Sequence, residues 1–459
     1  MRRAGVATLL TLLLLVAATM LVALREWRPA WRGYQVAAAE ASDGPTSGRG
    51  VVAVDVAATG ERELCLTCHA GLEEMSRSHP RALGCVVCHG GQAGALDAEV
   101  AHQGLVGGAN PSALDVVERG CGAAGPGGER CHGGGALDRD HVARVWRSLQ
   151  ATYAGGIGAV LTTFSGIHGP TGVVAEARDA RATDGLPRIV ALDARADEAP
   201  PVGQTARDLR QSCVTGGCHL NSSGGEVDGS SGHAAGCAAC HVLSTGAQTY
   251  QGADAAVAAS AVPGGGRHEF TVGIPFTQCN TCHNRGIYDL RGLRFYPRDD
   301  MTGPQMYEGS EASYYRPGER YAQCEVTLNC IDCHTQVEIM GDGRLLADKA
   351  AAQRTRCSTC HGTPENAPAP RTVSASDTTL RALGRASTVY DVRVGDRLAT
   401  AGGQHVLSST RWEDDRLIVT DKVDGSQHPV PLVRGSGCEQ DGSSQRAQYC
   451  HTCHYQELP

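Results

Sequence analysis

The sequence predicts a mostly irregular and α-helical fold, with a single N-terminal transmembrane helix and a small β-rich insert near the C-terminus. Three observations support this fold class. The 459 residues include 59 Gly and 20 Pro, which favour loops and short helices. Phe and Trp number only four each, so large aromatic side chains cannot fill the core of so long a chain. The uncharged run at residues 5–24 is long enough to cross a bilayer as one helix.

One short motif recurs along the chain. It has two cysteines separated by two residues, with a histidine directly after the second, and it is the covalent attachment signature of c-type haem. The thiols bond to the porphyrin vinyl groups, and the adjacent imidazole binds the iron from one face. We name each motif by its first cysteine. The regular motifs begin at Cys65, Cys85, Cys237, Cys279, Cys330, Cys357 and Cys450.

Zinc sites and disulfides are the alternatives for paired cysteines. A structural zinc site needs four ligands in a closed tetrahedral set and has no reason to require histidine at one fixed offset. Every Cys-x-x-Cys pair in this chain is nonetheless followed by histidine, although the chain has only 18 His. Haem attachment therefore explains the pattern, and the flat apolar porphyrins would supply the core that aromatic side chains do not.

Two further units are irregular. Cys121 is separated by nine residues from Cys131-His132, which permits haem attachment if the loop bulges away from the ring; the alternative is a disulfide and a chance Cys-His pair. Cys213–His219 is a stretched form of the motif, and with both units the chain would carry about nine haems. The predicted thioether cysteines are Cys65, Cys68, Cys85, Cys88, Cys121, Cys131, Cys213, Cys218, Cys237, Cys240, Cys279, Cys282, Cys330, Cys333, Cys357, Cys360, Cys450 and Cys453. The predicted proximal iron ligands are His69, His89, His132, His219, His241, His283, His334, His361 and His454.

Nine histidines lie outside the attachment units, one for each predicted iron. Bis-histidine ligation of every haem would need this number, although a lone histidine is usually a surface or core residue. No spare histidine lies between His283 and His405, so haems of that span need ligands from distant parts of the chain. The distal candidates are His79, His102, His141, His168, His233, His268, His405, His428 and His451, with Met301, Met306 and Met340 as alternatives.

Two cysteines are left over, Cys324 and Cys438. Outside the cytoplasm they would form a disulfide that ties the β-rich insert to the haem region. The alternatives are two free thiols or a cysteine ligand to iron. Elsewhere, apolar residues at helical spacing predict a helix with His141 in its first turn and Asp140 as its N-cap.

The motifs and composition shifts divide the chain into seven parts. A membrane anchor and a linker precede a cluster of three haems; a loop-rich insert leads to a cluster of five, and a β-rich subdomain precedes the last haem. The boundaries are 1–32 (anchor), 33–60 (linker), 61–153 (three haems), 154–205 (insert), 206–370 (five haems), 371–437 (β-rich) and 438–459 (C-terminal haem segment).

The chain resembles bacterial multihaem c-type cytochromes, a group allied to octahaem tetrathionate reductases and hydroxylamine oxidoreductases. The resemblance rests on the attachment motifs, on Ser78-His79-Pro80 ahead of the Cys85 motif, and on Met340-Gly341-Asp342-Gly343 after the Cys330 motif. It covers most of 61–361 and the C-terminal motif, but not the β-rich part. It implies haem c and iron as cofactors and respiratory electron transfer outside the cytoplasmic membrane.

The N-terminal sequence predicts the cellular location of the protein. Trp27 and Trp31 after the apolar run are typical interfacial anchors, which favours a retained single-pass helix in the cytoplasmic membrane. A cleaved signal peptide, and hence a secreted protein, is the alternative. The resemblance implies haem attachment after export, so the haem domain would face the periplasm. Its partners would be redox proteins or a quinol-linked membrane donor, and the net charge of −8 argues against nucleic acid.

Two functions follow from the ligand count. If every iron carries histidine on both faces, the protein is an electron carrier, because no iron has an open position for substrate. The alternative is an oxidoreductase acting on a small nitrogen or sulfur compound at one five-coordinate haem. The sequence favours the carrier, because it holds enough spare histidines and no Cys-x-x-Cys-Lys.

Intact mass of the exported protein tests the haem count directly. We expect nine covalently attached haems. Eight or seven would show that one or both of the irregular units do not bind haem, and bound zinc in place of haem would contradict the interpretation of the motif.

Overall fold

The computed structural model describes nearly two thirds of the chain, including most of the motif-bearing segments. The described residues are 2–27, 29–41, 50–56, 60–108, 110–125, 128–135, 139–151, 199, 234–245, 247, 249–257, 265–283, 295–297, 315–317, 320–321, 323–344, 352–438, 450, 454 and 456–457. Predicted site residues outside this part are His168, Cys213, Cys218, His219, His233, His451 and Cys453, and only the backbone is described for Cys282 and His283.

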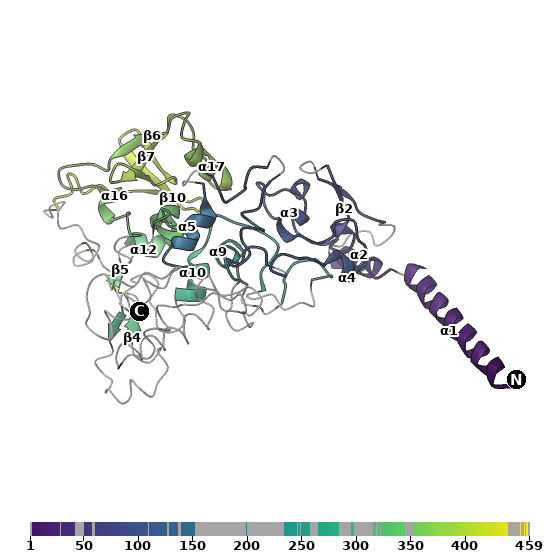
Figure 1. Ribbon diagram of the computed structural model, residues 1–459. Helices are drawn as coiled ribbons and strands as arrows, with labels where there is room; N and C mark the ends of the chain where they lie inside the picture. The colour runs from purple at the N-terminus through teal and green to yellow at the C-terminus, as the bar shows by residue number, and fades with distance from the viewer. Residues whose placement is uncertain are drawn as a thin grey trace.

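The chain begins with helix α1, Arg2–Trp27, which extends away from the rest of the described structure (Figure 1). Its side chains from Leu10 to Val22 are exposed and mostly apolar. A search of the described residues finds no helix with the length and apolar character of a membrane span. The predicted membrane anchor at 1–32 therefore stays a prediction.

The segment predicted as a linker, 33–60, contains regular secondary structure. Helix α2, Trp31–Ala41, buries Gln35 together with the small side chains of its inner face. The Gln35 amide donates to the carbonyls of Gly50 and Thr67, each at 3.0 Å, and so ties α2 to the Cys65 motif. Alanine-rich composition suggested a linker, but small side chains also allow a helix to pack closely.

The part of the chain that carries the motifs is built from very short helices joined by loops. Gly90 and Gly362 follow the histidines of two motifs at φ values of 66° and 73°, which ends the helical turn there. Figure 1 shows α3, α9, α10 and α16 following one another from the N-terminal side toward the β-rich part. The described helices are η1 Cys65–Thr67, η2 Arg81–Leu83, α3 Val86–His89, α4 Ala98–Ala101, α5 His141–Arg147, α9 Ala238–His241, α10 Phe276–His283, α12 Gln323–Thr327, α13 Cys330–Cys333, α14 Gln336–Met340 and α16 Cys357–His361.

A small apolar core lies under the motifs in the middle of the chain. Helix α5 begins at His141, and the Asp140 carboxylate accepts from the Ala143 N–H at 2.9 Å, which confirms the predicted helix and its N-cap. Cys121 and Cys237 pack against the edge of this core, so their thiols border apolar side chains. The buried members are Leu114, Val117, Val142, Val145, Trp146 and Ala151.

The β-rich unit is the most regular part of the structure. Six strands form two three-stranded antiparallel sheets, ordered β6-β7-β8 and β11-β10-β9, and helix α17, Thr378–Ala386, precedes β7. Leu398 and Leu417 are fully buried in its strands. The strands are β6 Pro370–Thr372, β7 Arg397–Ala401, β8 His405–Val406, β9 Thr410–Glu413, β10 Arg416–Thr420 and β11 Gln427–Pro429. Elsewhere the described strands are β1 Val54–Asp55, β2 Arg62–Glu63, β3 Phe295–Pro297, β4 Tyr315–Pro317, β5 Arg320–Tyr321 and β12 Gln456–Glu457.

The β-rich unit is bound to two attachment motifs by specific polar contacts. The Lys422 backbone N–H donates to the Asp332 carboxylate at 2.9 Å, and the Lys422 ammonium donates to the carbonyl of Ile331. The N–H of the His361 ring donates to the carbonyl of Pro431 at 2.8 Å. These contacts hold the unit against the Cys330 and Cys357 motifs.

Candidate haem-binding site

Five of the seven regular motifs close as a single turn through one backbone hydrogen bond. The N–H of the histidine donates to the carbonyl of the first cysteine, four residues earlier. This bond brings both thiols and the imidazole to the same side of the turn, because residues three and four apart share a helix face. The distances are 3.0 Å for His69 to Cys65, 2.9 Å for His89 to Cys85, 3.1 Å for His241 to Cys237, 2.8 Å for His334 to Cys330 and 2.8 Å for His454 to Cys450.

The irregular Cys121 unit makes the same hydrogen bond despite its long loop. The His132 N–H donates to the Cys121 carbonyl at 3.2 Å, and the Cys131 N–H donates to the Ala123 carbonyl at 3.0 Å. A bridge between Ala124 and Arg130 closes the intervening residues into a small hairpin. The loop therefore bulges out of the unit, and His132 keeps the backbone bond to the first cysteine that the regular motifs make.

Four imidazole pairs lie at a separation that suits an iron between them. With iron–nitrogen bonds of about 2.0 Å on both faces, the two ring centroids lie about 6.3 Å apart. The observed separations of the ring centroids are 6.1 Å for His69–His102, 6.1 Å for His89–His268, 5.9 Å for His79–His132 and 5.7 Å for His132–His141.

Ordinary aromatic contacts have similar centroid distances, so distance alone does not identify a ligand pair. The composition of the pairs is the stronger observation. Among the histidines that the structure describes, each of these four ring contacts joins one motif histidine to one spare histidine, and His132 takes part in two of them. Chance packing has no reason to respect that division, whereas bis-histidine ligation requires it.

His79, His132, His141 and His241 form one cluster. His132 contacts both His79 and His141, and burial, with a smaller effect of the nearby His241, lowers the pKa of the other three. Two of the four belong to attachment units and two are spare. The cluster thus holds the number of imidazoles that two bis-histidine haems need, with His132 and His241 as the proximal ligands.

Several of these imidazoles have the Nδ1 atom occupied by a hydrogen bond, which leaves Nε2 for a metal. This second contact is typical of metal-binding histidines, whose orientation it fixes. The Nδ1 partners are the Asp254 carboxylate for His69 at 2.6 Å, the Thr271 carbonyl for His241 at 2.7 Å, the Pro431 carbonyl for His361 at 2.8 Å, the Glu73 carbonyl for His268 at 3.2 Å, and the Ser76 and Ser78 hydroxyls for His79 at 3.0 and 3.2 Å.

Burial keeps most of the clustered imidazoles neutral, which is the form that binds iron. It lowers the pKa of His89 and of His141 to about 4, helped by the neighbouring imidazoles. Burial also lowers the pKa of His241. His69 differs, because its hydrogen bond to Asp254 raises its pKa.

The attachment thiols of successive units are neighbours in space. The free thiols of Cys65 and Cys85, of Cys121 and Cys237, and of Cys279 and Cys330 interact in pairs, and this interaction raises the pKa of Cys85, of Cys121 and of Cys279. Weaker charge interactions extend this row from the Cys65 motif to the Cys357 motif. They link Cys88 with Cys121 and Cys131, Cys240 with Cys279, and Cys333 with Cys360, and they help burial to raise the pKa of Cys88, of Cys279 and of Cys333.

Glu63, Cys65 and Cys85 form a group with metal-ligating atoms within 4.8 Å of one another. The Glu63 oxygens already accept the backbone N–H groups of Cys85 at 2.5 Å and of Val86 at 3.3 Å, at the start of α3. The two cysteines belong to different attachment motifs. Glu63 therefore orients the Cys85 motif, and the group offers only three of the four ligands that a structural zinc site needs.

The β-rich unit carries two of the distal candidates, and neither contacts a motif histidine among the described residues. His428 lies 2.9 Å from the Ser426 hydroxyl. Burial and the charge of Arg354 lower the pKa of His405, which faces the segment between the Cys330 and Cys357 motifs.

The two leftover cysteines, Cys324 and Cys438, are not joined by a disulfide in the described structure. Cys324 lies instead near the thiols of Cys333 and Cys360 and helps burial to raise the pKa of each. The predicted clamp between the insert and the haem region is therefore not formed by a sulfur bridge here. Polar contacts of Lys422 and His361 hold the β-rich unit in place.

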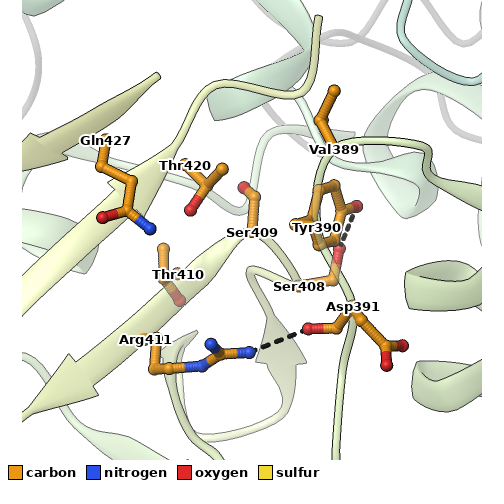
Figure 2. A pocket seen from close by; sticks show the side chains of 9 residues that line it. All are labelled: Val389, Tyr390, Asp391, Ser408, Ser409, Thr410, Arg411, Thr420 and Gln427. Atoms are coloured by element: carbon orange, nitrogen blue, oxygen red, sulfur yellow. Dashed lines mark hydrogen bonds between the residues drawn. The ribbon is translucent and has the colours of Figure 1, made fainter. Parts of the chain in front are cut away.

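Figure 2 shows a small polar pocket in the β-rich unit, between the segment of Tyr390 and strands β9 and β10. The Tyr390 and Ser408 hydroxyls lie 3.1 Å apart, and the Arg411 guanidinium donates to the Asp391 carbonyl at 2.9 Å. Its lining contains no cysteine and no histidine. It therefore offers a haem neither attachment nor an iron ligand.

Two residues that support the site were not predicted from the sequence, Asp254 and Glu73. Each acts through a partner more than 170 residues away, and no local pattern marks either of them. No family model, curated protein or solved structure matches this chain. The proposed function therefore rests on the attachment units, the imidazole pairs and the row of thiols.

Deletion of residues 123–129 tests the irregular unit. It leaves Cys121-Gly122-Arg130-Cys131-His132, a regular motif, and the hairpin already lies outside the turn. We therefore expect the haem count by intact mass to be unchanged. The double variant Cys121→Ala, Cys131→Ala should lose one haem, and a wild-type count in that variant would contradict attachment at this unit.

Removal of a spare histidine tests the pairing. We expect His268→Ala to leave the iron bound by His89 with one open face, giving a high-spin ferric signal and carbon monoxide binding by the reduced protein. Glu269→Ala is the matched control, because it changes an exposed neighbour of His268 and removes no imidazole. Equal spectra for the two variants would show that His268 is not a ligand.

Proposed function

We propose that this chain is a multihaem c-type cytochrome that relays electrons through about nine covalently bound, mostly bis-histidine haems. The observation that carries this proposal is the pairing of each contacting motif histidine with a spare histidine at a separation suited to iron. When bound, haem supplies an iron that changes oxidation state by one electron. The protein holds it, orients it and closes its faces.

The ligand arrangement favours transfer over catalysis. His102 opposite His69 and His268 opposite His89 would fill the second axial position of both irons. The four-imidazole cluster would do the same for two more. An iron with both positions filled cannot bind a substrate, so these centres would be restricted to electron transfer.

The row of neighbouring thiols supports a relay rather than isolated centres. Three thiol pairs and three longer-range charge interactions link seven attachment units from Cys65 to Cys360, in the order of the sequence apart from the Cys213 unit, which lies outside the described residues. Cofactors attached at adjacent thiols would be separated by little protein. Such spacing favours fast transfer along the row.

The proposal includes a location outside the cytoplasmic membrane, because the resemblance implies that haem is attached after export. The donor would then be a redox protein or a quinol-linked membrane component. Retention by an N-terminal anchor is part of the proposal, with signal cleavage as the alternative. The N-terminus of the mature protein distinguishes the two.

Spectroscopy of the purified protein tests the relay. We expect only low-spin ferric signals, no carbon monoxide binding after reduction, and uptake of one electron per haem in a reductive titration. A high-spin ferric centre or an iron that binds carbon monoxide would favour the oxidoreductase. Zinc in place of iron would refute both functions.

A further inference from the structure

The buried carboxylate of Asp254 is not explained by haem attachment. Asp254 is fully buried, and one of its oxygens accepts from the His69 ring at 2.6 Å while the other accepts from the Ala256 N–H at 2.9 Å. It is thus fixed at both oxygens, with its negative charge directed at the imidazole of the first attachment unit.

The loop that carries Asp254 is clamped to the Cys65 motif. Glu73 accepts the Tyr250 hydroxyl and, at 3.0 Å, the Ala253 N–H. Gly71 packs so tightly that a Cβ there would lie 2.1 Å from the Ala253 carbonyl oxygen. Side-chain substitution at this position would push the loop away, so the contact between His69 and Asp254 is built into the packing.

The other motif histidines with a described Nδ1 partner bond to neutral groups. His241 donates to the Thr271 carbonyl and His361 to the Pro431 carbonyl. A carboxylate acceptor draws the Nδ1 proton more strongly and makes the imidazole a more basic ligand. A more basic, more anionic ligand stabilises ferric over ferrous iron and so lowers the reduction potential.

We propose that Asp254 is a positioning residue that, through His69, makes the haem of the Cys65 motif the low-potential end of the relay. This inference rests on the proposed function. A second buried carboxylate, Glu63, lies beside Cys65 and acts in the same direction. The Cys65 motif contacts α2, so the low-potential end lies next to the N-terminal helices, where electrons would enter.

The test is Asp254→Asn in the full-length holoprotein, measured by spectroelectrochemical titration. Removal of the charge should raise the lowest-potential step, with the ferrous-to-ferric ratio at a fixed potential increasing about tenfold, which for one electron is an upward shift of about 59 mV. Asp254→Glu, which keeps the charge, should shift the step less. Asp55→Asn is the matched control, because this carboxylate has a side-chain exposure of 79% and pairs with Arg62.

A variant that lacks the first haem shows whether the Asp254 substitution changes the potential of that haem. In the variant Cys65→Ala, Cys68→Ala, the further change Asp254→Asn should leave the remaining potentials unchanged. An unchanged lowest step in Asp254→Asn, or the same shift in the background without that haem, would overturn the role of Asp254. A protein without haem would instead refute the proposed function itself.

A measurement on the unsubstituted protein keeps the inference testable if Asp254→Asn does not fold. Infrared difference spectra should show a carboxylate band that changes when the lowest-potential haem is reduced. If that reduction perturbs no carboxylate band, Asp254 does not set the potential.

Discussion

The bond from the motif histidine N–H to the carbonyl of its first cysteine, made in five regular motifs and in the Cys121 unit, is the constraint on which the motif-bearing part of the described structure depends. It needs only one turn of helix, so the units can be held by chain that is otherwise loops. The bond also explains why the Cys121 unit tolerates nine residues between its thiols. Its hairpin lies outside the turn, and His132 still donates to Cys121.

Local features could be predicted from the sequence because they depend on neighbouring residues. The attachment units are short patterns, and the helix at His141 follows from apolar spacing with Asp140 before it. The structure of segment 33–60 was harder to predict from the sequence, because its small residues suit both a linker and a closely packed helix. In the structure, the Gln35 amide donates to the backbone of the Cys65 motif, and this contact stabilises helix α2.

The sequence predicts only how many imidazole pairs can form. Which histidines pair depends on contacts between distant parts of the chain. His268 is held by the Glu73 carbonyl, 195 residues earlier, and this contact brings it to His89. The Asp254 carboxylate meets His69 across 185 residues. Equal numbers of motif and spare histidines predict that pairs exist, but only packing selects the partners.

The β-rich insert has no attachment motif, yet its contacts make it part of the body that holds the motifs. Asp332 lies inside the Cys330 motif, and burial raises its pKa to about 7. The Lys422 backbone N–H and ammonium approach it and the adjacent Ile331 carbonyl. Burial lowers the pKa of Lys422, and the nearby carboxylate of Asp332 opposes this effect. The far end of the thiol row thus holds the partly buried Lys422 of the insert together with the buried carboxylate of Asp332, whereas the buried charged side chains described beside the Cys65 motif, Asp254 and Glu63, are carboxylates alone. The row is electrostatically asymmetric because its two ends are packed by different parts of the chain.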